Sequence, residues 1–86
     1  MFLHIGNKKS IKTKDIIGIF DMDTATVSPI TKEYLKTAER DKRTVSVSLE
    51  LPKAFILKDD GTVYFSQIST STLQGRNETI NQAKNK

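Results

Sequence analysis

The segment Lys53-Ala-Phe-Ile-Leu-Lys-Asp-Asp-Gly-Thr-Val-Tyr-Phe-Ser-Gln67 has the pattern of a β-hairpin. Residues 53–58 and 62–67 are rich in β-branched and aromatic side chains, and Asp59-Asp60-Gly61 between them is typical of a tight turn. Upstream, residues 44–51 alternate between apolar and polar side chains, which predicts a half-buried strand. We expect Pro52 to end that strand, because proline cannot donate a ladder hydrogen bond.

The N-terminal part of the chain predicts three more strands. Residues 2–6 form a short strand that ends at Gly6, residues 7–9 make a turn, and residues 10–13 can return as a second strand. Residues 15–21 are the strongest early strand, and Gly18 inside it indicates a bulge or a close backbone approach. The polar residues 21–26 that follow are typical of a turn.

A helix is predicted to begin after Ser28, with Pro29 at its first position, and to end near Asp41. At helical spacing an apolar face gathers Ile30, Thr31, Tyr34, Leu35 and Ala38, which we expect to be buried. The opposite face is a basic ridge, to which Lys32, Lys36, Arg40 and, just beyond, Arg43 belong.

Residues 69–72 offer several N-caps for a short helix over residues 70–76, and residues 77–86 are almost all polar. We therefore predict a single domain over residues 1–76, followed by a flexible C-terminal tail at 77–86. Strands, a helix, more strands and a short helix favour an α+β fold. It would have a small, mostly antiparallel sheet, one main amphipathic helix and a short C-terminal helix.

Length and composition limit the possible function classes. A chain of 86 residues has a thin core, which a partner subunit would help to stabilise. The absence of cysteine excludes disulfides, zinc–thiolate sites, thiol catalysis and iron–sulfur clusters. No apolar run is long enough to span a bilayer and no signal-peptide core is present, so we expect a cytoplasmic protein without a membrane partner.

The sequence does not favour an enzyme. His4 is the one histidine, and its strand position favours a structural role over a catalytic one. Asp21 and Asp23 could share a hard cation with Asp15 or Thr24, but aspartates there more often close a turn by accepting from backbone amides. No glycine-rich phosphate loop or HExxH pair occurs. We expect no metal, cofactor or small-molecule substrate, and a metal-dependent enzyme at Asp21 and Asp23 stays a minor alternative.

The charge balance permits a polyanionic partner, since 14 basic residues against 10 acidic ones give +4. One basic patch comprises Lys8, Lys9, Lys12 and Lys14, and the helix ridge is a second. Either could instead be ordinary surface: an edge strand protected by charge, or a solvated helix face on which Glu39 pairs with Arg43. Three to five phosphate contacts per subunit would bind DNA weakly, so useful affinity would need several subunits on one duplex.

Several blocks of the sequence occur together in a known family. They are His4-Ile5-Gly6, residues 13–21 (TKDIIGIFD), Leu51-Pro52-Lys53-Ala54, residues 64–69 (YFSQIS), and Thr72-Leu73 with Arg76. In this order and spacing the chain strongly resembles the RemB (YaaB) branch of the RemA/RemB family of bacterial extracellular matrix regulators. The resemblance covers roughly residues 1–76, and none of its blocks is a catalytic signature.

The resemblance implies a LytTR-like fold and a cytoplasmic, ring-forming homo-oligomer that binds double-stranded DNA and regulates transcription of biofilm-matrix genes. In the RemA branch, basic residues on the turn before the central hairpin contact DNA. The matching stretch here is residues 49–53, in which Lys53 is basic and Glu50 acidic, so only Lys53 is carried over. The Lys8–Lys14 cluster is expected to supply most of the remaining charge, with Lys36, Arg40 and Arg43 as secondary candidates. The rival hypothesis is a protein-interaction or assembly module that does not bind DNA.

Overall fold

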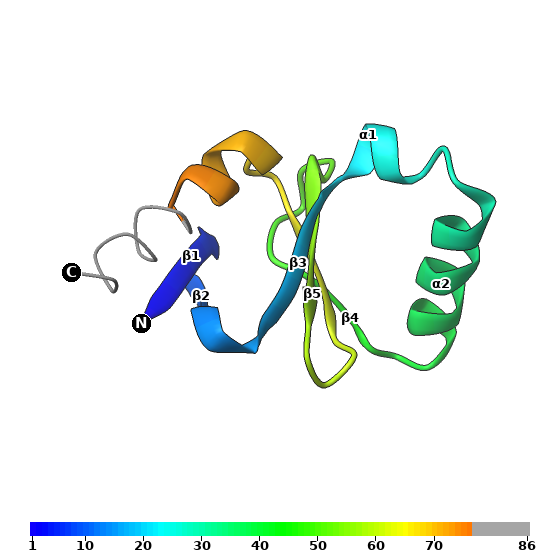
Figure 1. Ribbon diagram of the computed structural model, residues 1–86, viewed down its shortest axis with the longest axis horizontal. Helices are drawn as coiled ribbons and strands as arrows, with labels where there is room; N and C mark the ends of the chain where they lie inside the picture. Colours follow the sequence, from blue (N-terminus) through cyan, green and yellow to red (C-terminus); the bar gives the residue numbers. More distant parts are fainter. Residues whose placement is uncertain (77–86) are drawn as a thin grey trace.

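The structure is a computed structural model that describes residues 1–76, and it has an α+β fold, as predicted (Figure 1). The strands are β1 (Phe2–Gly6), β2 (Lys9–Lys12), β3 (Ile16–Asp21), β4 (Thr44–Ser46), β5 (Ala54–Lys58) and β6 (Val63–Ser66). The helices are α1 (Met22–Ala25) and α2 (Pro29–Arg40); a 3₁₀ turn covers Thr13–Asp15, and residues 70–76 are helical. Among residues 1–76, no helix is long and apolar enough to cross a membrane. The predicted flexible tail at 77–86 lies outside the described residues.

The predicted hairpin is the middle of a four-stranded sheet with the order β3-β5-β6-β4. β5 pairs antiparallel with both β3 and β6. At the turn, Gly61 has a φ of +88°, a backbone conformation that glycine adopts without a steric cost. The Asp60 carboxylate accepts a hydrogen bond from the Thr62 amide at 2.9 Å, which holds the turn closed.

The predicted strand over residues 44–51 is wrong beyond Ser46. β4 has only three residues and pairs parallel with β6. The Val47 amide donates to the Phe65 carbonyl and the Lys53 amide donates to the Ser66 carbonyl, which are adjacent positions on β6. The chain between these two bonds must therefore leave the sheet. Tertiary pairing overrides the local alternation, and residues 48–52 form a loop.

Two apolar clusters lie on opposite faces of this sheet, so the molecule has three layers (Figure 1). The first cluster fills the space between the sheet, the β1–β2 hairpin and the helical residues 70–76; it contains Leu3, Ile5, Ile11, Val47, Ala54, Ile56, Tyr64 and Leu73. The second lies under α1 and α2 and contains Ala38, Phe55 and Val63. β5 sends alternate side chains into the two clusters, which explains its continuous apolar run.

The β1–β2 hairpin forms a separate two-stranded sheet, close to the predicted boundaries. Its turn is left-handed at Gly6, Asn7 and Lys8, where φ is 115°, 51° and 65°. The buried hydroxyl of Ser66 donates to the Ile5 carbonyl at 2.7 Å and accepts from the Ile68 amide at 3.0 Å. The bond to Ile5 fastens the hairpin to β6, and the bond from Ile68 closes a local turn after β6.

The sequence correctly predicted the start of α2, from Ser28 and Pro29, and the bulge in β3, from Gly18. The Ser28 hydroxyl accepts from the Thr31 amide, and α2 ends at Arg40 with Asp41 as its C-cap. At Gly18 the register between β3 and β5 shifts, and a Cβ there would lie 2.6 Å from the Phe20 ring. The expected bulge is confirmed, whereas the close approach at Gly18 is made by the Phe20 side chain rather than by a backbone.

The expected burial of the apolar face of α2 is only partly right. Ala38 is buried, and Thr31 and Leu35 are half-buried, but Ile30 is 82% exposed and Tyr34 39% exposed. The end of α2 is tied to the sheet, because the Val63 amide donates to the Arg43 carbonyl at 2.8 Å. Its first turn follows the loop after α1 and leaves an open groove against the sheet.

Candidate nucleic-acid interface

The outer face of the β1–β2 hairpin combines cations with an exposed aromatic ring. Leu3 and Ile5 of β1 point into the first apolar cluster, so Phe2 points outward. Phe2 lies opposite Lys12 in the antiparallel register, and side chains that lie opposite each other share one face of a sheet. The exposed ring of Phe2 therefore lies beside the Lys12 side chain.

A hollow of about 270 Å³ lies where this hairpin meets the hairpin end of β5. It is lined by Phe2, Lys9, Ser10, Ile11, Lys12, Asp15, Lys58 and Tyr64. The Lys9 ammonium lies 5.5 Å from the centroid of the Tyr64 ring, within range of a cation–π interaction that favours one position of this side chain. Lys58 reaches the same hollow from a distant part of the sequence, because the sheet register places it beside Ile16, just after the 3₁₀ turn.

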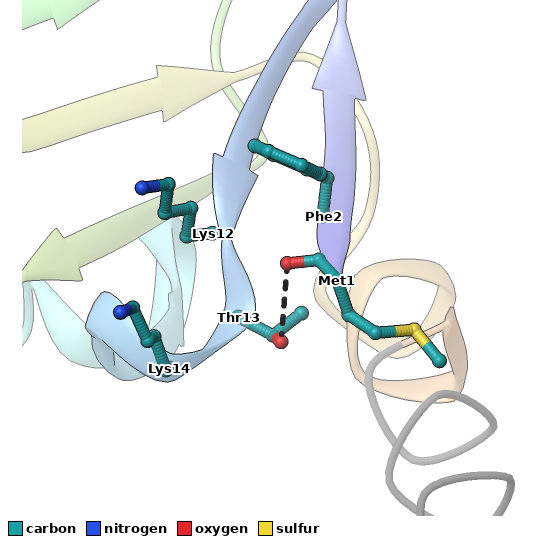
Figure 2. Close-up of a pocket in the computed structure, with 5 residues that line it drawn as sticks. All are labelled: Met1, Phe2, Lys12, Thr13 and Lys14. Atoms are coloured by element: carbon teal, nitrogen blue, oxygen red, sulfur yellow. Dashed lines mark hydrogen bonds between the residues drawn. The ribbon is translucent and has the colours of Figure 1, made fainter.

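A second hollow, also of about 270 Å³, adjoins the first and shares Phe2 and Lys12 with it (Figure 2). Met1, Thr13 and Lys14 complete its lining. The Thr13 amide and hydroxyl both point to the Met1 carbonyl, at 3.1 and 3.4 Å, which joins the chain start to the end of β2. In Figure 2 the side chains of Lys12 and Lys14 extend to the same side. We call Lys9, Lys12, Lys14 and Lys58 together the basic surface.

The carboxylates near the basic surface leave it positively charged. Lys58 lies 3.6 Å from Asp60, and this carboxylate is the largest cause that raises the pKa of Lys58 above its ordinary value. The pKa of Asp60 is lowered, first by its hydrogen bond with Thr62. Asp15 also lines the first hollow. The ammonium groups outnumber these two carboxylates, so the surface can attract phosphate oxygens, while Asp15 repels an anion placed deep in the hollow.

The helix ridge lies on α2, across the sheet from the β1–β2 hairpin (Figure 1). Lys36 and Arg40 are exposed there, and Arg40 donates weakly to the Thr37 hydroxyl at 3.5 Å. Arg43 is used by the fold: it donates to the Gly61 carbonyl at 2.7 Å and pairs with Asp41 at 3.5 Å. The ion pair of Arg43 is therefore with Asp41 rather than with Glu39, which the helical spacing had suggested.

Lys8 is next to Lys9 in the chain, whereas Lys53 lies at the opposite end of β5 from Lys58. Lys8 is exposed on the β1–β2 turn and lines neither hollow. Lys53 precedes β5 and Lys58 ends it, so their Cα atoms are about 16 Å apart along the strand. Both backbone polar groups of Lys53 are hydrogen-bonded: its amide donates to the Ser66 carbonyl, and its carbonyl accepts from the Met22 amide.

The candidate metal and catalytic residues have structural positions. Asp21 caps α1, and one of its carboxylate oxygens accepts from the Thr24 amide at 3.0 Å and the Thr24 hydroxyl at 3.2 Å. The expectation that an aspartate accepts from a backbone amide here is confirmed for Asp21, but residues 22–25 form helix α1 rather than the predicted turn. His4 is exposed, and its carbonyl accepts from Arg76. Within residues 1–76, no three His, Cys, Asp or Glu residues gather to hold a metal ion.

Reading the sequence for basic clusters missed three members of this site. Phe2 and Tyr64 carry no charge, and Lys58 was counted only as a strand residue. The lysine lies next to the hairpin turn, but only the register of β3 against β5 brings it to the Lys9–Lys14 cluster. That register depends on the bulge at Gly18, whose exact offset the local sequence does not show.

Comparison with known proteins places these features in a family. The family described as RemA-like, extracellular matrix regulatory protein A-like, matches residues 2–76. The chain is also 38% identical over 77 residues to extracellular matrix regulatory protein B of Bacillus subtilis strain 168, which covers 88% of this chain and 89% of that protein. The match spans both hairpins, the main helix and the loop that contains Lys53. This chain therefore belongs to the RemA-like family of extracellular matrix regulatory proteins.

Proposed function

We propose that this protein is a cytoplasmic, homo-oligomeric regulator of matrix genes that binds double-stranded DNA through its basic surface. The observation that carries the proposal is the convergence of Lys9, Lys12 and Lys14 with Lys58 around two adjoining hollows. Three of these residues come from the β1–β2 hairpin and its 3₁₀ turn, and the fourth comes from a different sheet. The family relationship supports a regulatory role rather than a catalytic one.

The chemistry of the basic surface suits phosphates better than base edges. Lysine ammonium groups act as flexible point charges, whereas base recognition usually employs planar, bidentate side chains such as arginine, asparagine or glutamine. Four ammonium groups per subunit give weak binding that depends strongly on salt. Repetition of the surface around a ring would raise the affinity, because each further contact becomes an intramolecular event.

The remaining basic candidates have subsidiary roles in this proposal. Lys8 on the β1–β2 turn and Lys53 on the β4–β5 loop add to the long-range attraction of DNA. Lys36 and Arg40 would reach DNA only if the assembly turned α2 toward it. Arg43 contributes least, since its guanidinium already bonds to Gly61 and Asp41.

Fluorescence anisotropy with a labelled promoter duplex tests the proposal between 50 and 200 mM salt. Each lost phosphate contact should reduce the slope of log K against log salt by about 0.9, so a Lys→Gln change at all four positions of the basic surface should flatten it by about 3 to 4. The matched control removes the same charge from the α2 side of the sheet, with Gln at Lys32, Lys36 and Arg40 and at Lys42, which is exposed just after the C-cap of α2. Equal losses in both variants, or a loss only in the control, would contradict the assignment.

A second candidate function is a protein-interaction module without DNA binding. The observation in its favour is the β4–β5 loop, where Leu49 and Leu51 are exposed on either side of the acidic Glu50. Such a loop suits a protein surface better than a phosphate backbone. An intact oligomer that fails to bind any duplex at 50 mM salt would favour this function over the first.

A further inference from the structure

An apolar groove of about 250 Å³ lies between α2 and the sheet. The sheet contributes Phe20, Phe55 and Leu57, with the first two rings stacked at a centroid distance of 5.0 Å. Ile30 and Tyr34 of α2 form the other wall. Both of these side chains are exposed, as is the ring of Phe20, so nothing in residues 1–76 covers the groove. An open apolar groove of this kind is typical of an interaction site.

A second apolar feature is the loop of residues 48–52, which we call the leucine loop. Leu49 and Leu51 are 108% and 88% exposed, more than any other large apolar side chains in residues 1–76. The loop is held at both ends by the two hydrogen bonds to β6 described above. Inside it, the Glu50 amide donates to the Ser48 hydroxyl at 3.1 Å, and Pro52 restricts the backbone. The two leucines are therefore displayed on a loop that is already ordered.

The leucine loop and the groove lie on different sides of the sheet. The loop follows Val47, which packs in the cluster under the β1–β2 hairpin, whereas the groove opens under α2. Figure 1 shows the segment between β4 and β5 on the side away from α2. One copy therefore cannot fill its own groove with its own leucines. A contact between two different surfaces of identical chains is heterologous, and its repetition gives a closed ring or an open filament.

We propose that Leu49 and Leu51 of one copy occupy the α2 groove of the next copy. The inference rests on the homo-oligomer in the proposed function and names the surfaces that build it. A second copy suits this groove because the chain itself carries the apolar side chains that the groove lacks. Leu49 and Leu51 are the most exposed large apolar side chains in residues 1–76, and they lie on the opposite side of the sheet. The Arg43 guanidinium, 5.9 Å from the Tyr34 ring centroid, already bonds to Gly61 and Asp41, so it adds little to this contact. Lys53 follows this loop and would then lie beside the subunit contact, which agrees with a DNA contact on the β1–β2 hairpin.

The mass of the assembly in solution, measured by light scattering without DNA, tests this contact. One variant removes the leucines (Leu49→Ser with Leu51→Ser), and a second alters the groove (Ile30→Ser with Tyr34→Ser). Each should be a folded monomer, with association weakened about 10²- to 10⁴-fold for the loss of two buried leucines. A mixture of the two variants should form a 1:1 dimer and nothing larger, because one intact groove meets one intact loop.

The controls separate this inference from the proposed DNA binding. Ile17→Ser also removes an exposed apolar side chain, 63% exposed on β3, and should keep the wild-type mass. Circular dichroism checks that each variant is folded. The leucine contact would be overturned if both double variants kept the wild-type mass, or if their mixture stayed monomeric. Neither result would contradict the proposed homo-oligomer. A monomeric wild type would overturn both. A variant that loses DNA binding but keeps the wild-type mass would give information on the basic surface and not on the leucine contact.

Discussion

The Ser66→Ala variant tests how the β1–β2 hairpin, and with it most of the basic surface, is held in place. The Ser66 side chain is fully buried and joins the Ile5 carbonyl to the Ile68 amide. Alanine removes the donor at 2.7 Å and the acceptor at 3.0 Å, and each backbone group then lacks its partner. A buried polar group left without a partner costs about 1–3 kcal/mol. The bond to the Ile5 carbonyl is buried but the bond from the Ile68 amide is only part-buried and costs less, so we expect a total loss of about 2–4 kcal/mol.

Urea denaturation followed by circular dichroism measures this loss, with Ser10→Ala on the exposed face of β2 as the matched control. The control should change the free energy of unfolding by no more than about 0.5 kcal/mol, as is usual for surface positions. The stability of a domain of this size is about 4–13 kcal/mol, so the Ser66 variant should still fold at low temperature. A change below about 0.5 kcal/mol for Ser66→Ala would refute the reasoning, because the hydroxyl would then not be fastening the hairpin.

Three further perturbations act on the scaffold, and urea denaturation measures each of them. Gly18→Ala places a Cβ 2.6 Å from the outer end of the Phe20 ring, which is 39% exposed and can move, so it should cost about 0.5–1.5 kcal/mol; an unchanged midpoint would contradict the close approach. Asp21→Ala removes the cap that accepts from Thr24 and should cost about 1 kcal/mol, whereas Asp21→Asn should retain most of the stability. The pKa of Asp60 is lower in the folded chain than its ordinary 3.8, so its stabilising effect is complete above that pH and is lost as the pH falls through the folded value. Asp60→Asn should therefore flatten the acid limb of stability below about pH 3.8, and an unchanged limb would count against the hydrogen bond with Thr62.

Local sequence signals predicted those parts of the fold that local chemistry determines. The turn at residues 59–61 needs a glycine with positive φ, and α2 needs an oxygen at Ser28 and a proline at its first position. These requirements act within four residues of chain, so they can be seen in the sequence. The bulge at Gly18 belongs to the same group, although its offset does not.

Features that depend on pairing with distant parts of the chain could not be predicted from the sequence. Val47 and Leu49 alternate as a strand would, but the positions of two acceptors on β6 end the strand at Ser46. In the same way, Lys58 joins the basic surface only because β5 pairs with β3. The spacing of lysines along the sequence shows the cluster around Lys12. Only the three-layer arrangement shows that the helix ridge lies on the other side of the sheet from it.

The central claim is that DNA phosphates contact the basic surface. Acetylation of exposed lysines, with and without bound DNA and read by mass spectrometry, tests this claim in the intact oligomer. DNA should protect Lys9, Lys12, Lys14 and Lys58, and should leave Lys32 and Lys36 on α2 as reactive as in the free protein. Protection of Lys32 and Lys36 with the four lysines of the basic surface unchanged would contradict the account.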